Sequence, residues 1–373
     1  MRRASTWWML LSVAVACTRK QDAGVSAPAG AYAVQDAIVL RESDIDFPLE
    51  GLDDGGIASL GKGRFALLDY RGKHVRVFDR TGAPVDTLGS AGGGPGEFLF
   101  PQRLVPLLDG VGVLDGQKQA IVRFDAAGAV LPALPLDSIV GVAAPRITGL
   151  RQVAADAWAY SALEPAPGRW REGLYLRTST GVRPLASTPT ARAVPIRMPC
   201  NVILPEEPPV FWPTVRWDAR GAQVVAAHDA SDTLWTRSAD AATAIVLGLP
   251  AREPTASDAL VLAIGFEVHA SGSSCRLTRE QALEQRTMAP TLPSITRVLV
   301  SPSGETWVLP AAARGATRTV RVVSVDGHVD SLPGAAMPVA FLDDTLYLAS
   351  EEDADGLAAL RRWRVRSARA ARR

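Results

Sequence analysis

The sequence has little lysine, little cysteine and no excess of charge of either sign. It has 40 basic and 39 acidic residues, so the formal net charge is +1, and only four of the basic residues are lysines (Lys20, Lys62, Lys73 and Lys118). Domains that bind nucleic acid usually carry a strongly basic face. The balanced charge therefore argues against nucleic-acid binding, and we interpret the arginine excess mainly as coding bias.

The chain also lacks motifs that would identify a catalytic or phosphate-binding site. No Gly-x-Ser-x-Gly sequence occurs, and the glycine-rich stretch 89–96 is not followed by Gly-Lys-Ser or Gly-Lys-Thr. The four histidines show no spacing typical of metal ligands. These absences favour a protein without catalysis, resident metal or cofactor, and we interpret 89–96 as a crossover turn.

The first apolar run, Trp7–Val15, is too short to span a bilayer and follows two arginines, as in a signal peptide over 1–16. It ends in Ala14-Val-Ala-Cys17, which resembles the bacterial lipobox. That resemblance implies a lipid on Cys17. The next residue is Thr18 and not the Asp that retains lipoproteins in the inner membrane, so the resemblance also implies the outer membrane of a bacterial envelope. The alternative is an ordinary signal peptide cleaved near Ala16. Residues 17–35 are small and polar and predict a flexible tether.

Two consecutive stretches repeat the same pattern at an offset of 46 residues. Phe65–Asp69, Val75–Asp79 and Gly82 are followed by Val111–Asp115, Ile121–Asp125 and Gly128. Short strands repeating at such a period predict propeller blades. Asp69 and Asp115 end strands, and because they repeat with the scaffold we expect them to accept backbone N–H groups rather than to bind calcium.

The second copy resembles the NHL repeat of six-bladed propeller lipoproteins in bacterial envelopes. The matching residues are Gly92–Phe98, Pro101, Asp109-Gly110, Val113–Asp115 and Val122–Asp125. The Asn and Arg that usually follow the strand-ending Asp are replaced by Gly72 and His74, and by Lys118 and Ala120. The resemblance therefore implies the architecture rather than an NHL ligand.

Weaker copies complete a prediction of six four-stranded antiparallel blades over residues 36–366, an all-β six-bladed β-propeller. Strand pairs are expected near 158–176, 223–235, 306–323 and 346–365. The isolated strand Ala37–Leu40 should close the last blade and so leave no open edge. Residues 367–373 form a basic tail.

Two irregular insertions interrupt the predicted ring. Residues 189–213 contain seven prolines, and residues 250–292 contain one short helix that begins after Thr278. Each insertion contains one cysteine, Cys200 and Cys275. In an oxidising compartment such a pair tends to form a disulfide, although two separate thiols remain an alternative.

Four arginines precede the first turn of their blades at odd offsets. Arg103 and Arg297 lie seven residues before Gly110 and Gly304, and Arg151 and Arg216 lie five residues before Asp156 and Gly221. Because strand side chains alternate, all four should point to the same side of their strands, which we predict to be the central channel. Alternatively, they lie at strand ends and fan into solvent or pair with neighbouring blades.

These features predict an envelope-anchored, non-catalytic binding scaffold, monomeric, with an anion-accepting channel. Its partner would be an envelope protein, a glycan or an anionic small molecule. The alternative is a propeller hydrolase or lyase with a divalent metal in the channel.

Overall fold

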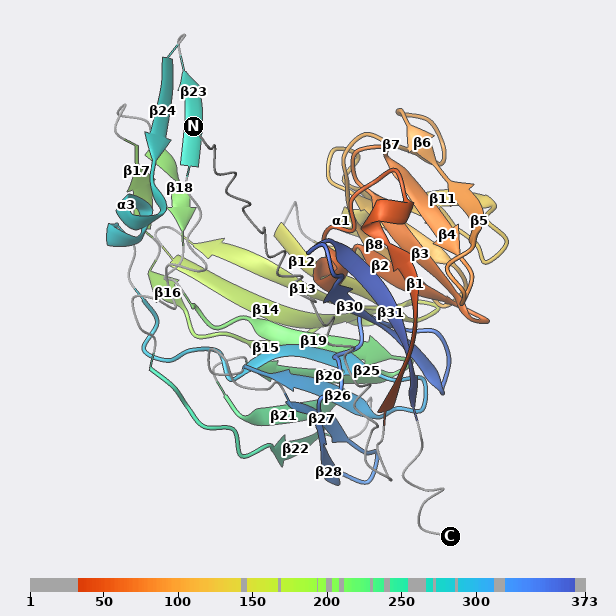
Figure 1. The fold of residues 1–373 in the computed structure, drawn as a ribbon. Helices are drawn as coiled ribbons and strands as arrows, with labels where there is room; N and C mark the ends of the chain where they lie inside the picture. The colour runs from red at the N-terminus through yellow and green to blue at the C-terminus, as the bar shows by residue number, and fades with distance from the viewer. Residues whose placement is uncertain are drawn as a thin grey trace, which may run out of the picture.

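The computed structural model describes residues 33–365 except the segments 142–145, 167–168, 193, 199–202, 208–210, 229–230, 238–241, 254–265, 271–272, 286–287 and 312–318. Six four-stranded antiparallel sheets are arranged in a ring, so the chain is a six-bladed β-propeller, as predicted (Figure 1). Among the described residues, no helix is both long enough and apolar enough to cross a membrane.

Each blade is an up-and-down sheet whose first strand lies innermost. Blades 1 to 3 are formed by β2 Ile57–Gly61, β3 Arg64–Asp69, β4 His74–Phe78 and β5 Pro84–Leu88; β8 Pro101–Pro106, β9 Val111–Asp115, β10 Ala120–Phe124 and β11 Val130–Pro135; and β12 Arg146–Ala154, β13 Ala157–Ala166, β14 Arg169–Thr178 and β15 Gly181–Ser187, with β16 Ala191–Arg192 pairing β14.

Blades 4 to 6 repeat this arrangement, and the last blade takes its outer strand from the N-terminal part of the chain. They are formed by β19 Val215–Arg220, β20 Gln223–His228, β21 Thr233–Arg237 and β22 Ala242–Val246; β25 Ile295–Val300, β26 Thr306–Pro310, β27 Thr319–Val323 and β28 Val329–Pro333; and β29 Ala340–Phe341, β30 Leu346–Glu352, β31 Ala358–Val365 and β1 Ala33–Arg41.

The described residues form six hydrophobic core clusters, each between two neighbouring blades. Phe65 and Leu348 belong to the cluster between blades 1 and 6, for example, and Val105 and Ile121 to the one between blades 2 and 3. The cluster between blades 5 and 6 is aromatic, with Trp307 and Tyr347 in edge contact at 5.2 Å between ring centroids. Each blade is therefore stabilised mainly by its two neighbours, which makes closure of the ring important.

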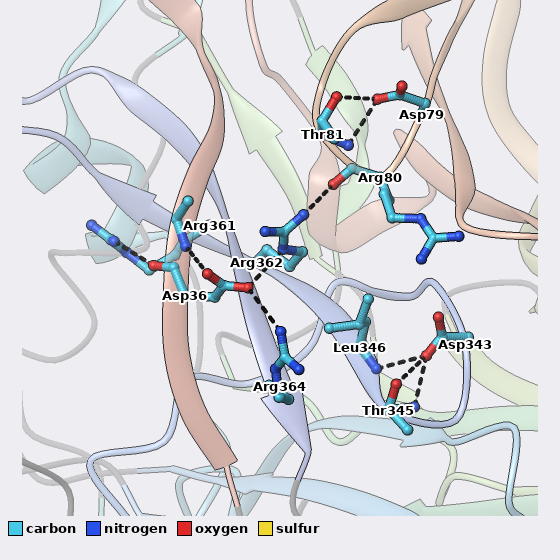
Figure 2. Close-up of polar contacts among 11 residues, drawn as sticks. Asp36, Asp79, Arg80, Thr81, Asp343, Thr345, Leu346, Arg361, Arg362 and Arg364 are labelled. Carbon is cyan, nitrogen blue, oxygen red and sulfur yellow. Dashed lines mark hydrogen bonds and ion pairs between the residues drawn. The ribbon is translucent and has the colours of Figure 1, made fainter.

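The ring closes where β1 pairs antiparallel with β31, as predicted from Ala37–Leu40, although the strand is longer. Figure 2 shows the polar contacts at this seam: Arg362 Nε donates to the Asp36 carboxylate at 2.9 Å, and Arg361 donates to the Asp36 carbonyl at 3.0 Å. Arg362 also donates to the carbonyl of Arg80 in blade 1 at 3.0 Å. One side chain therefore joins the closing strand, the last blade and the first blade.

The hairpin turns share a local structure that explains the 46-residue repeat. Asp79 accepts N–H bonds from Thr81 and Ala83 at 2.7 and 3.1 Å, and Asp125 accepts the equivalent pair at 2.9 and 2.8 Å. The carboxylate fixes the turn, and the glycine that follows takes a positive φ, 85° at Gly82. The turn of Asp353 is built in the same way, with Gly356 at a φ of 77°.

The strand-ending aspartates belong to the scaffold, as predicted. Asp115 is fully buried and accepts N–H groups from Gln117 and Lys118 at 3.0 and 2.9 Å, and from Leu99 at 2.7 Å. Asp69 accepts the N–H of Gly72 at 2.7 Å. The stretch 89–96 connects β5 to β8 and contributes to a small parallel pair, β6 Ser90–Ala91 with β7 Glu97–Phe98, so it is a crossover.

The two insertions form a projection beside the ring (Figure 1). They contain two hairpins and the helix expected after Thr278, namely β17 Val194–Arg197 with β18 Ile203–Glu207, β23 Phe266–Ala270 with β24 Ser273–Leu277, and α3 Arg279–Glu284. A capping box of Thr278 and Gln281 begins α3. Gln285 accepts from the Arg197 N–H at 2.7 Å and donates to its carbonyl at 2.9 Å, so hydrogen bonds join the insertions.

Three further short helices lie among the described residues. They are η1 Glu42–Asp44, η2 Leu52–Asp54 and α1 Leu136–Val140. None of the three was predicted from the sequence, and η2 lines the channel described below.

Candidate functional site

The centre of the propeller contains a cavity of about 840 Å³, here called the channel cavity. The innermost strands β8, β12, β19 and β25 line it, together with η2 and parts of β13, β14 and β26. Binding sites for drug-sized molecules occupy roughly 300–1,000 Å³. The channel cavity is therefore large enough for a small ligand.

All four arginines predicted to share a side of their strands line this one cavity. Arg103 lies on β8, Arg151 on β12, Arg216 on β19 and Arg297 on β25, each the first strand of its blade. The structure thus brings together residues that are up to 194 positions apart in the chain. Their ligand-binding role stays a prediction.

Two of these arginines are neutralised by carboxylates that the sequence analysis did not identify. Arg151 forms an ion pair with Asp218 at 2.9 Å and donates to the Ala219 carbonyl at 2.9 Å, both in blade 4. Arg297 of blade 5 pairs with Asp53 of η2. These two side chains line the cavity, as predicted, and they also pair with neighbouring elements, as the alternative interpretation proposed.

Asp218 joins three blades. It is buried on β19, pairs with Arg151 of blade 3, and accepts the backbone N–H of Val300 in blade 5 at 2.7 Å. A buried carboxylate needs such partners because desolvation of an unpaired charge is costly. Asp218 lies two residues after Arg216, so the two side chains are on the same side of β19. This spacing was the sequence signal that could have placed Asp218 in the channel.

Arg103 differs from these two arginines. Its guanidinium donates to the Thr148 carbonyl of blade 3, and no ion pair joins it to a carboxylate of the described residues. Burial lowers the pKa of Arg103 from its usual value, while Asp54, Tyr70 and Glu172 act in the opposite direction at longer range. Arg103 is thus a largely desolvated cation with unused N–H donors beside an open cavity.

A buried glutamate completes the polar wall of blade 3. Glu172 on β14 is 5% exposed, and its carboxylate accepts from the Thr148 hydroxyl and from the Val215 N–H at 2.8 Å. Burial raises the pKa of Glu172, and the Thr148 and Val215 hydrogen bonds oppose that effect. Glu172 lies two residues before the buried Leu174, so both side chains point to the same face of β14. This alternation was the available sequence signal for its burial.

This glutamate ends a chain of hydrogen bonds with a single direction. The Trp217 indole N–H donates to Ser161 Oγ at 2.9 Å, and the Ser161 and Thr148 hydroxyls are 2.7 Å apart. Because Thr148 donates to Glu172, Ser161 must donate to Thr148. The network uses each hydroxyl proton and leaves Arg103 as the clearest donor to a ligand.

The η2 turn reaches across the cavity from blade 2 to blade 5. The Gly55 carbonyl accepts from Leu104 N–H at 2.7 Å, next to Arg103, and two residues earlier Asp53 pairs with Arg297. The segment before blade 1, which contains η2, does not follow the blade repeat. Sequence periodicity therefore did not place Asp53 in the channel.

The other predicted sites lie partly outside the described residues. Cys17, the signal peptide, residues 18–32 of the tether, Cys200 and the basic tail are among the residues that are not described. Cys275 is disulfide-bonded, whereas its pairing with Cys200 stays a prediction. Within the described ranges, no three His, Cys, Asp or Glu side chains come together in a way that could hold a metal ion.

No family model matches the chain, and no curated protein matches it in sequence. Among solved structures, an inferred exported protein from Bacteroides fragilis shares 11% identity at a TM-score of 0.50, over 90% of this chain and 96% of that one. A DUF4221-family member from Bacteroides vulgatus shares 8% identity at a TM-score of 0.47, over 89% of this chain and 97% of that one. Since the identity is so low, the likeness to the first protein shows a similar fold and no more.

Proposed function

We propose that this chain is a non-catalytic, extracytoplasmic binding propeller whose channel cavity accepts the anionic group of a small ligand. The observation that supports this function is the state of Arg103: a desolvated guanidinium lines the cavity, and none of the described carboxylates is within ion-pair distance. An anion placed there would form charge-assisted hydrogen bonds, and the guanidinium fork suits a carboxylate particularly well.

The charge balance of the cavity favours a ligand of low negative charge. Among the described residues, five arginines line it against four carboxylates, which are Asp53, Asp54, Glu172 and Asp218. One positive charge is left over, so a monoanion would neutralise the cavity, whereas a multiply charged anion would give it a net negative charge. We therefore expect a carboxylate group rather than a multiply charged phosphate.

The location outside the cytoplasm rests on the N-terminal sequence. Arg2-Arg3, the apolar run and Ala14-Val-Ala-Cys17 support export and a lipid on Cys17, and the similar Bacteroides fragilis fold belongs to a protein named as exported. Anchoring in the outer membrane and the relation to NHL propellers belong to the same proposal. The Cys17→Ala variant should be released from membranes or remain unprocessed, and unchanged membrane partition would contradict the anchor.

The binding claim is tested by the thermal stability of the purified protein in millimolar acetate, glucuronate, citrate, phosphate and sulfate. A ligand that binds only the folded ring raises the melting temperature. We expect a rise with monocarboxylates that Arg103→Gln abolishes and that Arg183→Gln, at an exposed arginine on β15, preserves. No shift with any anion would contradict the proposal, and a stoichiometric divalent metal in the purified protein would favour the metal-dependent enzyme instead.

A further inference from the structure

A second cavity adjoins the channel cavity between blades 5 and 6. This side pocket has a volume of about 670 Å³ and shares four lining residues with the channel cavity: Asp53, Arg297, Leu309 and Val339. The Asp53–Arg297 ion pair therefore lies where the two spaces meet. Asp53 is the exposed partner of this pair, because its side chain is 71% exposed and that of Arg297 only 16%.

The side pocket has the opposite excess of charge. Of the described residues that line it, Arg297 is the one cation, against the carboxylates of Asp53, Glu351 and Glu352. Glu351 is matched by Arg361, whose Nε donates to both of its oxygens at 2.8 Å. Glu352 forms no side-chain hydrogen bond or ion pair with any described residue, so it is the acceptor left for a cation.

The wall between the two charged ends is apolar. Leu309 and Val339 line both spaces, and Met337 and Ala358 continue the wall into the side pocket. Burying a methylene group against such a surface is favourable. A flexible aliphatic chain could therefore connect a group at Arg103 with a group at Glu352 at little cost in desolvation.

We infer that the channel cavity and the side pocket form one bipartite site for an elongated zwitterion, an ω-aminocarboxylate. Its carboxylate binds Arg103, its methylene chain lies against Leu309 and Val339, and its ammonium group binds Glu352. The carboxylate half of this inference rests on the proposed function. The ammonium half rests on the side pocket alone, so the two can be tested separately.

The test is calorimetric titration of the full chain at low salt with matched pairs of ligands. The probes are γ-aminobutyrate, ε-aminocaproate and ω-aminocaprylate, each compared with butyrate, caproate or caprylate. A partly exposed ion pair stabilises by up to ~1 kcal/mol, so the amine should raise affinity about threefold to fivefold for the length that spans the site. Glu352→Gln should remove this gain and leave carboxylate affinity unchanged, and Glu284→Gln, on the exposed face of α3, should preserve it.

The outcomes separate the inference from the proposed function. Plain carboxylates that bind as tightly as every amino derivative would overturn the bipartite site and leave the channel proposal standing. A gain that survives in Glu352→Gln would also overturn it. If no carboxylate of either series binds, the proposed function fails as well.

Discussion

Replacing Asp218 with alanine should weaken the propeller by loosening three blades at once. Asp218 is 4% exposed and links Arg151 of blade 3 to the Val300 N–H of blade 5. Alanine would leave that N–H buried without its acceptor, which costs about 1–3 kcal/mol. The ion pair contributes less than about 1 kcal/mol, because the Arg151 side chain is 27% exposed and keeps its bond to Ala219.

We therefore expect Asp218→Ala to lower the free energy of unfolding by about 1–4 kcal/mol. Asp218→Asn should lose less, because its amide oxygen can still accept from Val300. Arg151→Met should also lose more than the ion pair contributes, because it leaves the buried Asp218 carboxylate without its counter-ion. Asp344→Ala serves as the control, since this aspartate is exposed and forms no hydrogen bond with a described residue.

Urea unfolding followed by tryptophan fluorescence measures these differences at constant pH. The prediction is that Asp218→Ala loses most, Asp218→Asn loses less and Asp344→Ala loses least. If Asp218→Ala unfolds within about 0.5 kcal/mol of wild type, as an ordinary surface substitution does, the inter-blade role of Asp218 is wrong.

Three further predictions concern ring closure and the insertions. The hydrogen bond from Arg362 lowers the pKa of Asp36 below its usual value, so its stabilisation is present above about pH 4 and is lost as pH falls through the lowered folded-state pKa. Asp36→Asn should lower the free energy of unfolding by about 0.5 kcal/mol at pH 7, and its urea midpoint should fall less steeply than that of wild type below pH 4. Identical pH profiles of the urea midpoint in the two proteins would contradict this. A Cβ at Gly82 would lie 1.7 Å from the Val39 carbonyl oxygen of β1, whereas one at Gly356 meets nothing, and φ is positive at both, 85° and 77°. Gly82→Ala should therefore destabilise by about 1–3 kcal/mol more than Gly356→Ala in the same unfolding assay, and equal losses would show that β1 does not pack as described. Thiol titration of the unreduced, exported protein should detect neither Cys200 nor Cys275, and two reactive thiols would exclude the predicted bridge.

The sequence predicted the ring because its signals are local. The Asp79 and Asp125 turns recur with the same hydrogen bonds, and a turn of this kind is determined by a few neighbouring residues. Strand alternation is equally local, so the parity of Arg103 and Arg297 correctly placed both on the channel side of their strands.

The partners of these arginines could not be predicted in the same way. Asp53 reaches Arg297 across 244 residues because η2 folds over the cavity, and the segment before blade 1 follows no repeat. The contact between Gln285 and Arg197 spans 88 residues between two irregular insertions. Such contacts depend on how the blades close in space. The inward-facing positions of Glu172 and Asp218, in contrast, could have been predicted from the alternation of side chains along their strands.

The most direct test of the account is the affinity of one small carboxylate, caproate, for wild-type protein and for Arg103→Gln, measured by calorimetry at low salt. A charge-assisted contact with a desolvated guanidinium is worth about 1.5–3 kcal/mol, so the substitution should weaken binding roughly tenfold or more. Arg183→Gln should bind as wild type does. Equal affinity in wild type and Arg103→Gln would contradict the claim that the channel recognises its ligand through Arg103.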